Sequence, residues 1–296
     1  MKTLTGKLKE ARIKTDEAFL RSIQSHKLQN NEIDEAAKYS FIGAGKALRP
    51  FLVFTFGELL NLASESAEQI ALAVEMVHTY SLIHDDLPAM DNDSLRRGKQ
   101  TCHIRFSEAT AILTGDALLT KAFEVLSNPK THPEASIRGE LVSLLAQSAG
   151  INGMIGGQLI DINGETKQLT EEEIFLMQEL KTGALLRFSC LAPAIASKAD
   201  ALLIKTIEAF AKNIGILFQI TDDLLDAEGD EKIVGKTLQK DKKSNKSNFV
   251  TLYGVKKARL MAQKIYSETT ALIDDTILKK SESLKQLTDF ILTRNH

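Results

Sequence analysis

Cysteine, proline and long apolar runs are all scarce in this chain. It has 296 residues but only two cysteines, Cys102 and Cys190, and neither lies in a CxxC or Cys/His ligand spacing. That pattern argues against a disulfide framework and indicates a reducing compartment. No uncharged apolar run approaches the roughly 20 residues needed to span a bilayer, and residues 1–7 lack the apolar core of a signal peptide. We therefore expect a cytoplasmic protein without stable membrane insertion.

Charge of one sign is also missing. The net charge is -2, which argues against a nucleic acid or an acidic membrane as the general partner. Hydrophobic residues make up 43% of the chain, enough for a substantial core, and charged residues make up an ordinary 26%. Local basic clusters remain able to bind a small anion.

The periodicity of apolar residues predicts helices. Only five prolines occur, and alternating strand patterns are scarce. Segments 70–81 and 207–225 place apolar residues at i, i+3, i+4 and i+7, and Thr170 with Glu173 has the spacing of a capping box. No Gly/Ser linker divides the chain. The prediction is an all-α, single-domain helical bundle over residues 1–296, built around a deep central cavity.

The most loop-like region runs from residue 228 to 248. It contains glycines and the charge run 240–246. A solvated loop explains this composition, and so does a lid that closes lysines over a phosphate. Both interpretations stay open at this stage.

The first of two aspartate-rich motifs contains Asp85, Asp86 and Asp91. It follows an apolar helical segment, and Pro88 disfavours helical geometry at the residue before it, so the helix should end there. Asp91 then folds back toward Asp85. Aspartate is almost never buried unless it is paired or binds a metal.

The second motif, Asp222, Asp223 and Asp226, ends another apolar helix and is preceded by Gln219. Like charges at this spacing destabilise a helix, and acidic residues at its C-terminal end oppose the macrodipole. Mg²⁺, which prefers oxygen ligands, would compensate. The two motifs together predict facing walls of a site for metal ions and a polyphosphate.

Four basic segments accompany the aspartates, around Lys46 with Arg49, Arg96 with Arg97, Lys181 with Thr182, and Lys236. Each alone is an ordinary surface feature. Beside two metal motifs they suit diphosphate clamps, because arginine presents a planar fork to phosphate and lysine a point charge. The sequence lacks a Walker A loop, a GxGxxG loop after a strand, a GxSxG elbow and a HExxH pair at His84.

On these motifs the chain resembles the isoprenyl (polyprenyl) diphosphate synthase family, in particular its bacterial farnesyl diphosphate synthase type. The matching segments follow the family's order and span nearly the whole chain: 45–50, 78–98, 114–119, 156–161, 181–183, 218–226 and 235–236. The resemblance implies an all-α homodimer that uses Mg²⁺, with several ions per site and Mn²⁺ as an alternative ion. It also implies condensation of isopentenyl diphosphate with dimethylallyl and geranyl diphosphate to farnesyl diphosphate.

The resemblance gives each matching residue an expected role. The expected metal ligands are Asp85, Asp86, Asp91, Asp222, Asp223 and Asp226. The isopentenyl diphosphate pocket is expected to contain Lys46, Arg49, His78 and Arg97, and Gly45 is expected to be a substrate-binding residue. The allylic diphosphate pocket is expected to contain Arg96, Lys181, Thr182, Gln219 and Lys236, with Gln158 and Asp161 nearby. Of these, Asp85, Asp86, Asp91, Arg96, Lys181, Asp222 and Lys236 are expected to act directly in catalysis.

Product length should depend on what blocks the tunnel below Asp85. A bulky ring there would stop the growing chain at fifteen carbons, so Tyr80 is the expected floor, with Ser81 beside it; an ordinary core tyrosine is the alternative. The chain departs from the family around Lys246, where relatives often have lysine followed by Thr-Tyr-Pro. We therefore do not expect Lys246 to be a ligand.

Three competing functions remain. A geranylgeranyl diphosphate synthase would share every motif and make a longer product. A class I terpene cyclase would share the metal motifs but need no isopentenyl pocket, so Lys46, Arg49 and Arg97 argue against it. A non-enzymatic helical scaffold would not explain three carboxylates at the end of each of two apolar helices.

Overall fold

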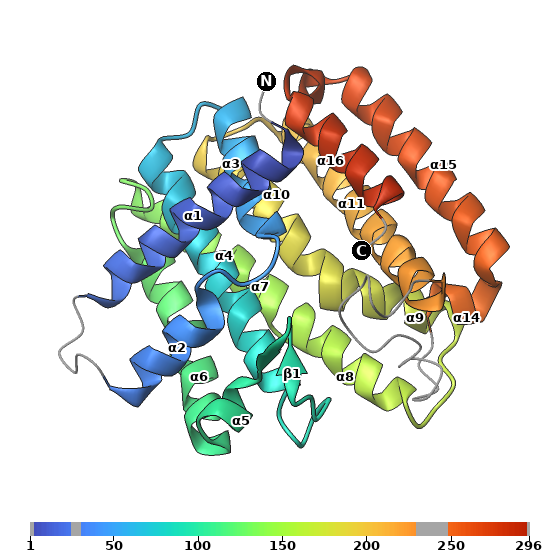
Figure 1. The fold of residues 1–296 in the computed structure, drawn as a ribbon. Helices are drawn as coiled ribbons and strands as arrows, with labels where there is room; N and C mark the ends of the chain where they lie inside the picture. Colours follow the sequence, from blue (N-terminus) through green and yellow to red (C-terminus); the bar gives the residue numbers. More distant parts are fainter. Residues whose placement is uncertain (1–2, 25–30, 229–247, 295–296) are drawn as a thin grey trace. The chain divides into compact units, whose positions relative to one another are not determined.

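The computed structural model describes residues 3–24, 31–228 and 248–294. Across these residues the regular structure is helical apart from two strands of two residues each (Figure 1). The predicted all-α fold is confirmed. The described residues include no helix that is long and apolar enough to cross a membrane.

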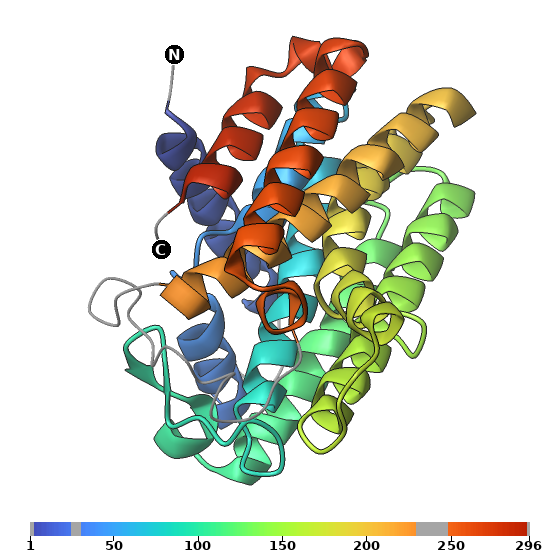
Figure 2. The same cartoon turned by 90° about the vertical axis from the view of Figure 1, so that its right-hand side faces the viewer.

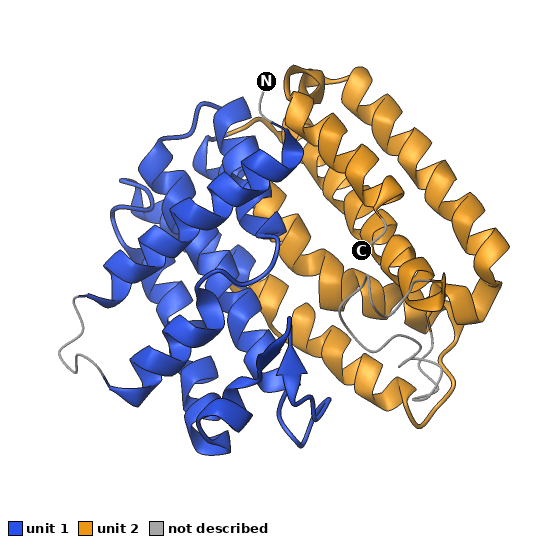
Figure 3. Cartoon of the chain, in the orientation of Figure 1, with its two compact units in different colours: residues 1–145, 192–198 blue, residues 146–191, 199–296 orange. Residues whose placement is uncertain are grey.

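The chain divides into two compact units (Figure 3). Unit 1 contains residues 1–145 and 192–198, and unit 2 contains residues 146–191 and 199–296. Two of the three boundaries fall inside helices α7 (Ala135–Ala149) and α10 (Ala184–Ala196), and the third follows α10, between residues 198 and 199. The single-domain organisation and the central cavity stay predictions.

Unit 1 contains most of the N-terminal helices and a short hairpin. Its elements are α1 (Leu4–Ile23), α2 (Glu32–Phe41), α3 (Leu48–Leu59), α4 (Ser64–Asp85), β1 (Leu95–Arg96), β2 (Lys99–Gln100), α5 (Cys102–Arg105), α6 (Glu108–Ser127) and the first part of α7.

Helix α4 is the core of unit 1. Its residues from Ile70 to Val77 are all buried, as expected for a helix that is apolar on every side. Helices α1, α3 and α6 pack around it. Phe19 of α1 stacks on Phe41 of α2, with ring centroids 4.1 Å apart. This packing fixes the direction in which the C-terminal end of α4 presents its aspartates.

Unit 2 begins at the end of α7. Its elements are α8 (Met154–Gly164), α9 (Glu171–Gln178), the π-helical turn η1 (Glu179–Gly183), most of α10, α11 (Ala201–Glu228), α14 (Phe249–Tyr253), α15 (Val255–Asp274), the 3₁₀ turn η2 (Ile277–Lys280) and α16 (Glu282–Thr293).

Helix α11 organises unit 2. It packs against α15, η1, α14 and α16, and it lies beside α15 in both views (Figures 1 and 2). The predicted capping box is present at the start of α9, where Thr170 accepts from the Glu173 N–H and the Glu173 side chain accepts from the Thr170 N–H. This box fixes where α9 begins and therefore the position of the η1 turn that follows it.

Candidate functional site

The first aspartate motif begins where α4 ends. Asp85 is the last residue of α4, and Asp86 caps it. The chain turns around Pro88, and the Asp91 N–H donates to the Asp85 carbonyl oxygen at 2.8 Å. The predicted return of Asp91 to Asp85 is confirmed. Asp85 and Asp91 are partly exposed, whereas Asp86 is only 3% exposed.

Asp86 is held by an arginine of the same unit. The Arg96 Nε and Nη2 atoms both contact Asp86 Oδ1, at 2.7 and 2.5 Å. Burial raises the pKa of Asp86 above its usual range, although Arg96 acts in the opposite direction. Burial works against the charge of Arg96, but the hydrogen bond to Asp86 and the charges of Asp86, Asp85 and Asp93 together raise the Arg96 pKa. Arg96, expected to bind an allylic diphosphate, is bound here to the aspartate motif itself.

A β-hairpin carries Arg96 and Arg97. Strands β1 and β2 pair antiparallel, with Leu95 opposite Gln100 and Arg96 opposite Lys99. The two residues between the strands, Arg97 and Gly98, have φ of 53° and 77°. Positive φ at both positions defines a type I′ turn, whose twist matches that of the strands. The sequence analysis did not predict this hairpin, because two-residue strands have too few residues to show alternation.

Gly45 lies directly beneath the Arg97 guanidinium. Gly45 has φ of 67°, and a Cβ atom there would lie 2.5 Å from Arg97 Cζ. Any other residue would therefore adopt an unfavourable backbone conformation and push Arg97 aside. The structure thus brings Gly45 and Arg97, two of the expected substrate-binding residues, together in unit 1.

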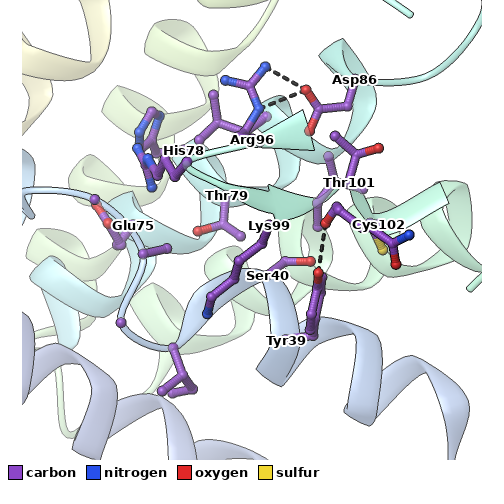
Figure 4. A pocket seen from close by; sticks show the side chains of 18 residues that line it. Tyr39, Ser40, Glu75, His78, Thr79, Asp86, Arg96, Lys99, Thr101 and Cys102 are labelled. Carbon is purple, nitrogen blue, oxygen red and sulfur yellow. Dashed lines mark hydrogen bonds and ion pairs between the residues drawn. The ribbon is translucent and has the colours of Figure 1, made fainter. Parts of the chain in front are cut away.

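These residues line a cavity of about 140 Å³ in unit 1 (Figure 4). The Arg96–Asp86 pair lies at one end, and Tyr39, whose hydroxyl donates to the Gln100 carbonyl oxygen at 2.7 Å, lies at the other. Predicted site residues in the wall are Gly45, His78, Asp86, Arg96 and Arg97, with Glu75, Tyr39 and Lys99 added by the structure.

His78 and Arg49 have different charge states in this environment. Burial, reinforced by Arg49 and Arg97, lowers the pKa of His78 well below its usual range. Burial lowers the pKa of Arg49 to about 10. At neutral pH, His78 is therefore a neutral hydrogen-bonding group and Arg49 a cation. Arg49 lies in the first turn of α3, and its Nε atom is buried without a hydrogen-bond partner among the described residues.

The expected chain-length residues lie on α4, one turn above its acidic end. Tyr80 is 5% exposed, and its ring meets His84 edge-on at a centroid distance of 5.6 Å. Burial raises the pKa of Tyr80 to about 12. The Ser81 hydroxyl donates to the His78 carbonyl oxygen at 2.9 Å. A buried ring suits both a tunnel floor and a core tyrosine, so the role of Tyr80 stays a prediction.

Gly115 explains one segment that the resemblance named without a function. A Cβ atom at this position of α6 would lie 2.1 Å from His84 Nε2. The same nitrogen lies 3.1 Å from the Ile112 carbonyl oxygen. Glycine at 115 therefore lets the His84 ring pack against α6, next to Asp85.

Unit 2 positions Lys181 on the π-helical turn. The Lys181 Nζ atom lies 2.5 Å from Asp161 Oδ2 on α8. A Cβ atom at Gly157 would lie 2.2 Å from the Lys181 backbone nitrogen, so glycine is required for α8 to approach η1. The Gln158 Nε2 atom is buried with no hydrogen-bond partner among the described residues. Within this unit the structure brings Lys181 to Asp161, while Gln158 lies on α8 with Asp161.

The second aspartate motif is connected to the same turn. The Thr182 hydroxyl donates to Gln219 Oε1 at 3.2 Å, and Gln219 Nε2 donates to Asp223 Oδ1 at 2.9 Å. The other Asp223 oxygen accepts from the Phe249 N–H at 2.9 Å. Asp223 is 4% exposed, so this carboxylate is a buried anchor of the unit.

Asp222 and Asp226 lie on the more open side of α11, and both are partly exposed. The Arg294 guanidinium approaches Asp222 Oδ1 at 3.4 Å and donates to the Phe218 carbonyl oxygen at 2.8 Å. Burial lowers the pKa of Arg294, and Asp222 partly opposes this. Arg294 was missed from the sequence, because only the fold brings a residue at the end of α16 to α11.

No group of three or more histidine, cysteine, aspartate or glutamate side chains lies close enough to hold a metal among residues 3–24, 31–228 and 248–294. The two aspartate motifs lie in different units, so their facing arrangement stays a prediction. Gly235, Lys236 and Lys246 fall outside the described residues, as does most of the proposed lid.

The sequence analysis also missed Arg12 and Glu75. Arg12 Nη1 lies 2.7 Å from Glu75 Oε1, and both residues are buried. A signal was present in the sequence, because Glu75 interrupts an apolar helical segment and a buried glutamate needs a partner. The partner was not identifiable, since it lies 63 residues away in the chain.

Comparison with known proteins agrees with this geometry. Residues 30–288 match the polyprenyl synthetase family. The farnesyl diphosphate synthase of Micrococcus luteus is 42% identical over 265 residues, 90% of each chain. The chain therefore belongs to the polyprenyl synthetase family.

Solved structures give the same result. An FPP/GFPP synthase from Zymomonas mobilis aligns with a TM-score of 0.88 and 37% identity, covering 98% of this chain and 99% of that one. A geranyltransferase from Helicobacter pylori, complexed with magnesium and isoprenyl diphosphate, aligns with a TM-score of 0.78 and 34% identity, covering 97% and 96% of the two chains.

Proposed function

We propose that this protein is a farnesyl diphosphate synthase. It joins isopentenyl diphosphate to dimethylallyl diphosphate and then to geranyl diphosphate, releasing one diphosphate at each step. The observation that carries the proposal is the basic cavity of unit 1, which adjoins the acidic end of α4. A terpene cyclase has no use for that cavity, because it binds no isopentenyl diphosphate.

The cavity suits the diphosphate of isopentenyl diphosphate. The guanidinium of Arg97 sits over Gly45, and Arg49 is a half-buried cation whose charge acts on Arg97's neighbour His78. Arginine forks bind phosphate oxygens in pairs. Neutral His78 adds a hydrogen-bonding group without adding charge. Lys46 precedes α3 in the same loop and completes the proposed set.

The allylic diphosphate is the leaving group. Its C1–O bond breaks and both electrons stay on the diphosphate, which leaves an allylic cation. The C4 double bond of isopentenyl diphosphate then forms a carbon–carbon bond to C1. A proton is lost to the released diphosphate, because no strong side-chain base lies in the motifs. Lys181, fixed by Asp161, and Thr182, fixed by Gln219, are the proposed ligands of the leaving group in unit 2.

The carboxylates suit a hard cation. Asp85 and Asp91 lie on one closed turn, and Asp222 and Asp226 lie one helical turn apart on α11. Oxygen ligands of this kind hold Mg²⁺ together with substrate phosphates. When bound, magnesium would supply positive charge at the departing diphosphate. We infer several Mg²⁺ ions per site, with Mn²⁺ as an alternative ion.

One incubation tests the function. The protein is mixed with isopentenyl diphosphate, geranyl diphosphate and MgCl₂, and the products are sized by chromatography after removal of the diphosphate. A fifteen-carbon product with release of diphosphate is expected. A twenty-carbon main product would instead identify a geranylgeranyl diphosphate synthase. A cyclic hydrocarbon formed without isopentenyl diphosphate would identify a cyclase, and no magnesium-dependent turnover would refute the enzyme.

Product length depends on Tyr80 in this proposal. Replacing it with alanine removes a buried ring one turn before Asp85 and should lengthen the product beyond fifteen carbons. Phe123→Ala, an aromatic truncation on α6, is the control and should leave the product length unchanged. An unchanged fifteen-carbon product from Tyr80→Ala would show that Tyr80 is an ordinary core residue that does not limit product length.

Two further proposals concern the setting of the enzyme. We infer a homodimer, which size-exclusion chromatography with light scattering would test. A cytoplasmic location, with no nucleic acid among its partners, follows from the composition and is tested by cell fractionation.

A further inference from the structure

Four arginines surround one short stretch of α4 in unit 1. They are Arg12, Arg49, Arg96 and Arg97, and all four act electrostatically on His78. Two carboxylates lie in the same cavity wall, Glu75 and Asp86. The arrangement therefore contains more cations than anions, and how they pair decides which arginines remain for a ligand.

The two carboxylates are already committed. Asp86 accepts two contacts from Arg96, and Glu75 lies 2.7 Å from Arg12. Among the described residues, neither Arg49 nor Arg97 has a carboxylate within ion-pair distance. Arg49 and Arg97 are thus the two guanidinium groups that the fold leaves available.

Glu75 would compete for these two arginines if Arg12 were absent. It attracts both of them, since its charge favours the protonated form of Arg49 and of Arg97. It is 3% exposed, so its charge is poorly screened by water. A buried carboxylate that loses its partner takes the nearest cation it can reach.

Arg12 and its neighbour Asp16 also hold the loop before α3. Arg12 Nη1 donates to the Ala44 carbonyl oxygen at 2.8 Å, and the Gly43 N–H donates to Asp16 Oδ2 at 3.0 Å. Arg12 Nε lies 3.0 Å from Asp16 Oδ1, which ties the two residues together. Helix α1 therefore holds the Gly43 N–H and the Ala44 carbonyl group, which both lie just before Gly45.

We propose that Arg12 is a positioning residue: it neutralises Glu75 and fixes the 43–45 loop, so that Arg49 and Arg97 stay available for the diphosphate of isopentenyl diphosphate. This inference rests on the proposed function, because it names the substrate. Arg12 touches no substrate in this arrangement, and its effect reaches the ligand through Glu75 and the loop. Through Arg12, helix α1 thereby affects the binding of isopentenyl diphosphate and not that of the allylic substrate.

The test compares four variants with the wild-type protein. Arg12→Met removes the partner of Glu75 and should raise KM for isopentenyl diphosphate at least tenfold, while KM for geranyl diphosphate changes less than twofold. Arg12→Met with Glu75→Gln removes the competing charge as well and should recover most of that loss. Glu75→Gln alone should leave KM for isopentenyl diphosphate equal or lower. Arg12→Lys keeps the charge but loses the fork, so an intermediate KM is expected.

Arg21→Met is the matched control. Arg21 also lies on α1 and also pairs with a glutamate of α4, Glu68, at 2.6 Å, but this pair is exposed and lies outside the cavity wall. It should leave both KM values at the wild-type level. Calorimetric titration with isopentenyl diphosphate provides a second readout that does not need turnover.

The outcomes separate the two proposals. A wild-type protein that neither binds nor consumes isopentenyl diphosphate would overturn the proposed function. An active wild type whose Arg12→Met variant keeps a normal KM would overturn this inference alone. So would a double variant no better than Arg12→Met, or an equal loss for both substrates. If Arg12→Met does not fold, the comparison of Arg12→Lys with Glu75→Gln decides, because the inference requires KM for isopentenyl diphosphate to rise in Arg12→Lys and not to rise in Glu75→Gln.

Discussion

The two aspartate motifs use their carboxylates in the same way but hold them with different partners. In each motif the second aspartate, Asp86 in unit 1 and Asp223 in unit 2, is buried and bound to its own unit, while the flanking aspartates are partly exposed. Among the described residues, Asp86 is held by a charged guanidinium, whereas Asp223 accepts from the neutral N–H groups of Gln219 and Phe249. In each motif the buried second aspartate therefore anchors the segment, and the two partly exposed aspartates are the candidate metal ligands. The amino-acid sequence alone does not distinguish the three.

The largest expected effect tests the flanking positions. Asp85→Asn should lower kcat by about 100-fold or more, because it removes charge where a leaving group must be stabilised. Its thermal midpoint should stay close to that of the wild type, since Asp85 is partly exposed. Asp275→Asn, on an exposed residue outside both aspartate motifs, is the control. A large loss of stability in Asp85→Asn would show that the flanking aspartate is also an anchor.

Alanine at the second aspartates should distinguish the partners. Asp223→Ala leaves the buried Phe249 N–H without an acceptor and should lower the free energy of unfolding by about 2 kcal/mol. Asp86→Ala should lose about 1 kcal/mol, because Arg96 is 31% exposed and turns to water. Urea unfolding measures both values. Equal losses would mean that the kind of partner does not matter.

Asparagine sharpens the same comparison. Burial already raises the pKa of Asp86, and an amide oxygen still accepts from Arg96, so Asp86→Asn should cost less stability than Asp86→Ala. In Asp223→Asn the amide NH₂ group must face one of the two N–H donors, from Gln219 or from Phe249, and cannot accept from it. Part of the stability lost in Asp223→Ala should therefore also be lost in Asp223→Asn. Urea unfolding of the four variants side by side would reveal a contrary order.

Glycines beneath the basic residues give the next effect. Gly157→Ala would press on the Lys181 backbone, which has little freedom, and should lower stability by about 2 kcal/mol. Gly45→Ala meets only the movable end of Arg97 and should lose about 1 kcal/mol to its positive φ. KM for isopentenyl diphosphate should rise about tenfold in Gly45→Ala.

Gly43→Ala is the matched control for Gly45→Ala. Its φ is 68°, and a Cβ atom there would meet nothing within 4 Å. It should show the same loss of stability and a much smaller change in KM. Equal KM changes in the two variants would show that the glycine at position 45 is not needed to place Arg97 for substrate binding.

The smallest expected effect is a pH dependence confined to unit 1. The folded-state pKa of His78 is lowered below its unfolded value near 6.5. The unfolded chain therefore binds the proton first as pH falls, and stability falls below about pH 6.5. The slope from this residue is at most about 1.4 kcal/mol per pH unit. Urea midpoints between pH 5 and 8 measure it.

His78→Gln should flatten that slope. His84→Gln is the comparison, because His84 lies on the same helix outside the cavity wall. The described residues of unit 2 include no histidine, so protection of its amides from hydrogen exchange should change little over this pH range. A slope that survives in His78→Gln would assign the acid sensitivity to another group.

Local patterns were sufficient to predict two apolar helical segments, 70–81 and 207–225, the end of α4 and the start of α9. Pro88 marks the end of α4, and Thr170 with Glu173 marks the start of α9, because both signals act within one turn of the chain. The aspartates of each motif were predicted as candidate ligands, and the structure brings Asp91 to Asp85 and Lys181 to Asp161 within their units. The assignment of each residue to a ligand stays a prediction.

Contacts between distant segments could not be predicted in this way. The burial of Asp86 and Asp223, the Arg12–Glu75 pair and the approach of Arg294 to α11 depend on tertiary packing. The hairpin could not be predicted for a different reason: its strands are local but have only two residues each, too few to show an alternating pattern. A sequence therefore identifies which charges are unusual before it identifies which charges are paired.

The η1 turn carries a consequence for sequence change within the family. From Glu171 to Ala196 the chain is one continuous helical run, and its π-helical middle accommodates one residue more than an α-helix would. Deleting a single residue there would convert the turn into a regular α-helix and keep the two flanking helices in register, while residues within the turn would rotate by about 100°. Lys181 would then point away from Asp161 while both flanking helices kept their hydrogen bonds. A relative whose aligned sequence lacks one residue in this turn would thus keep the helical fold but no longer place the equivalent of Lys181 in the site.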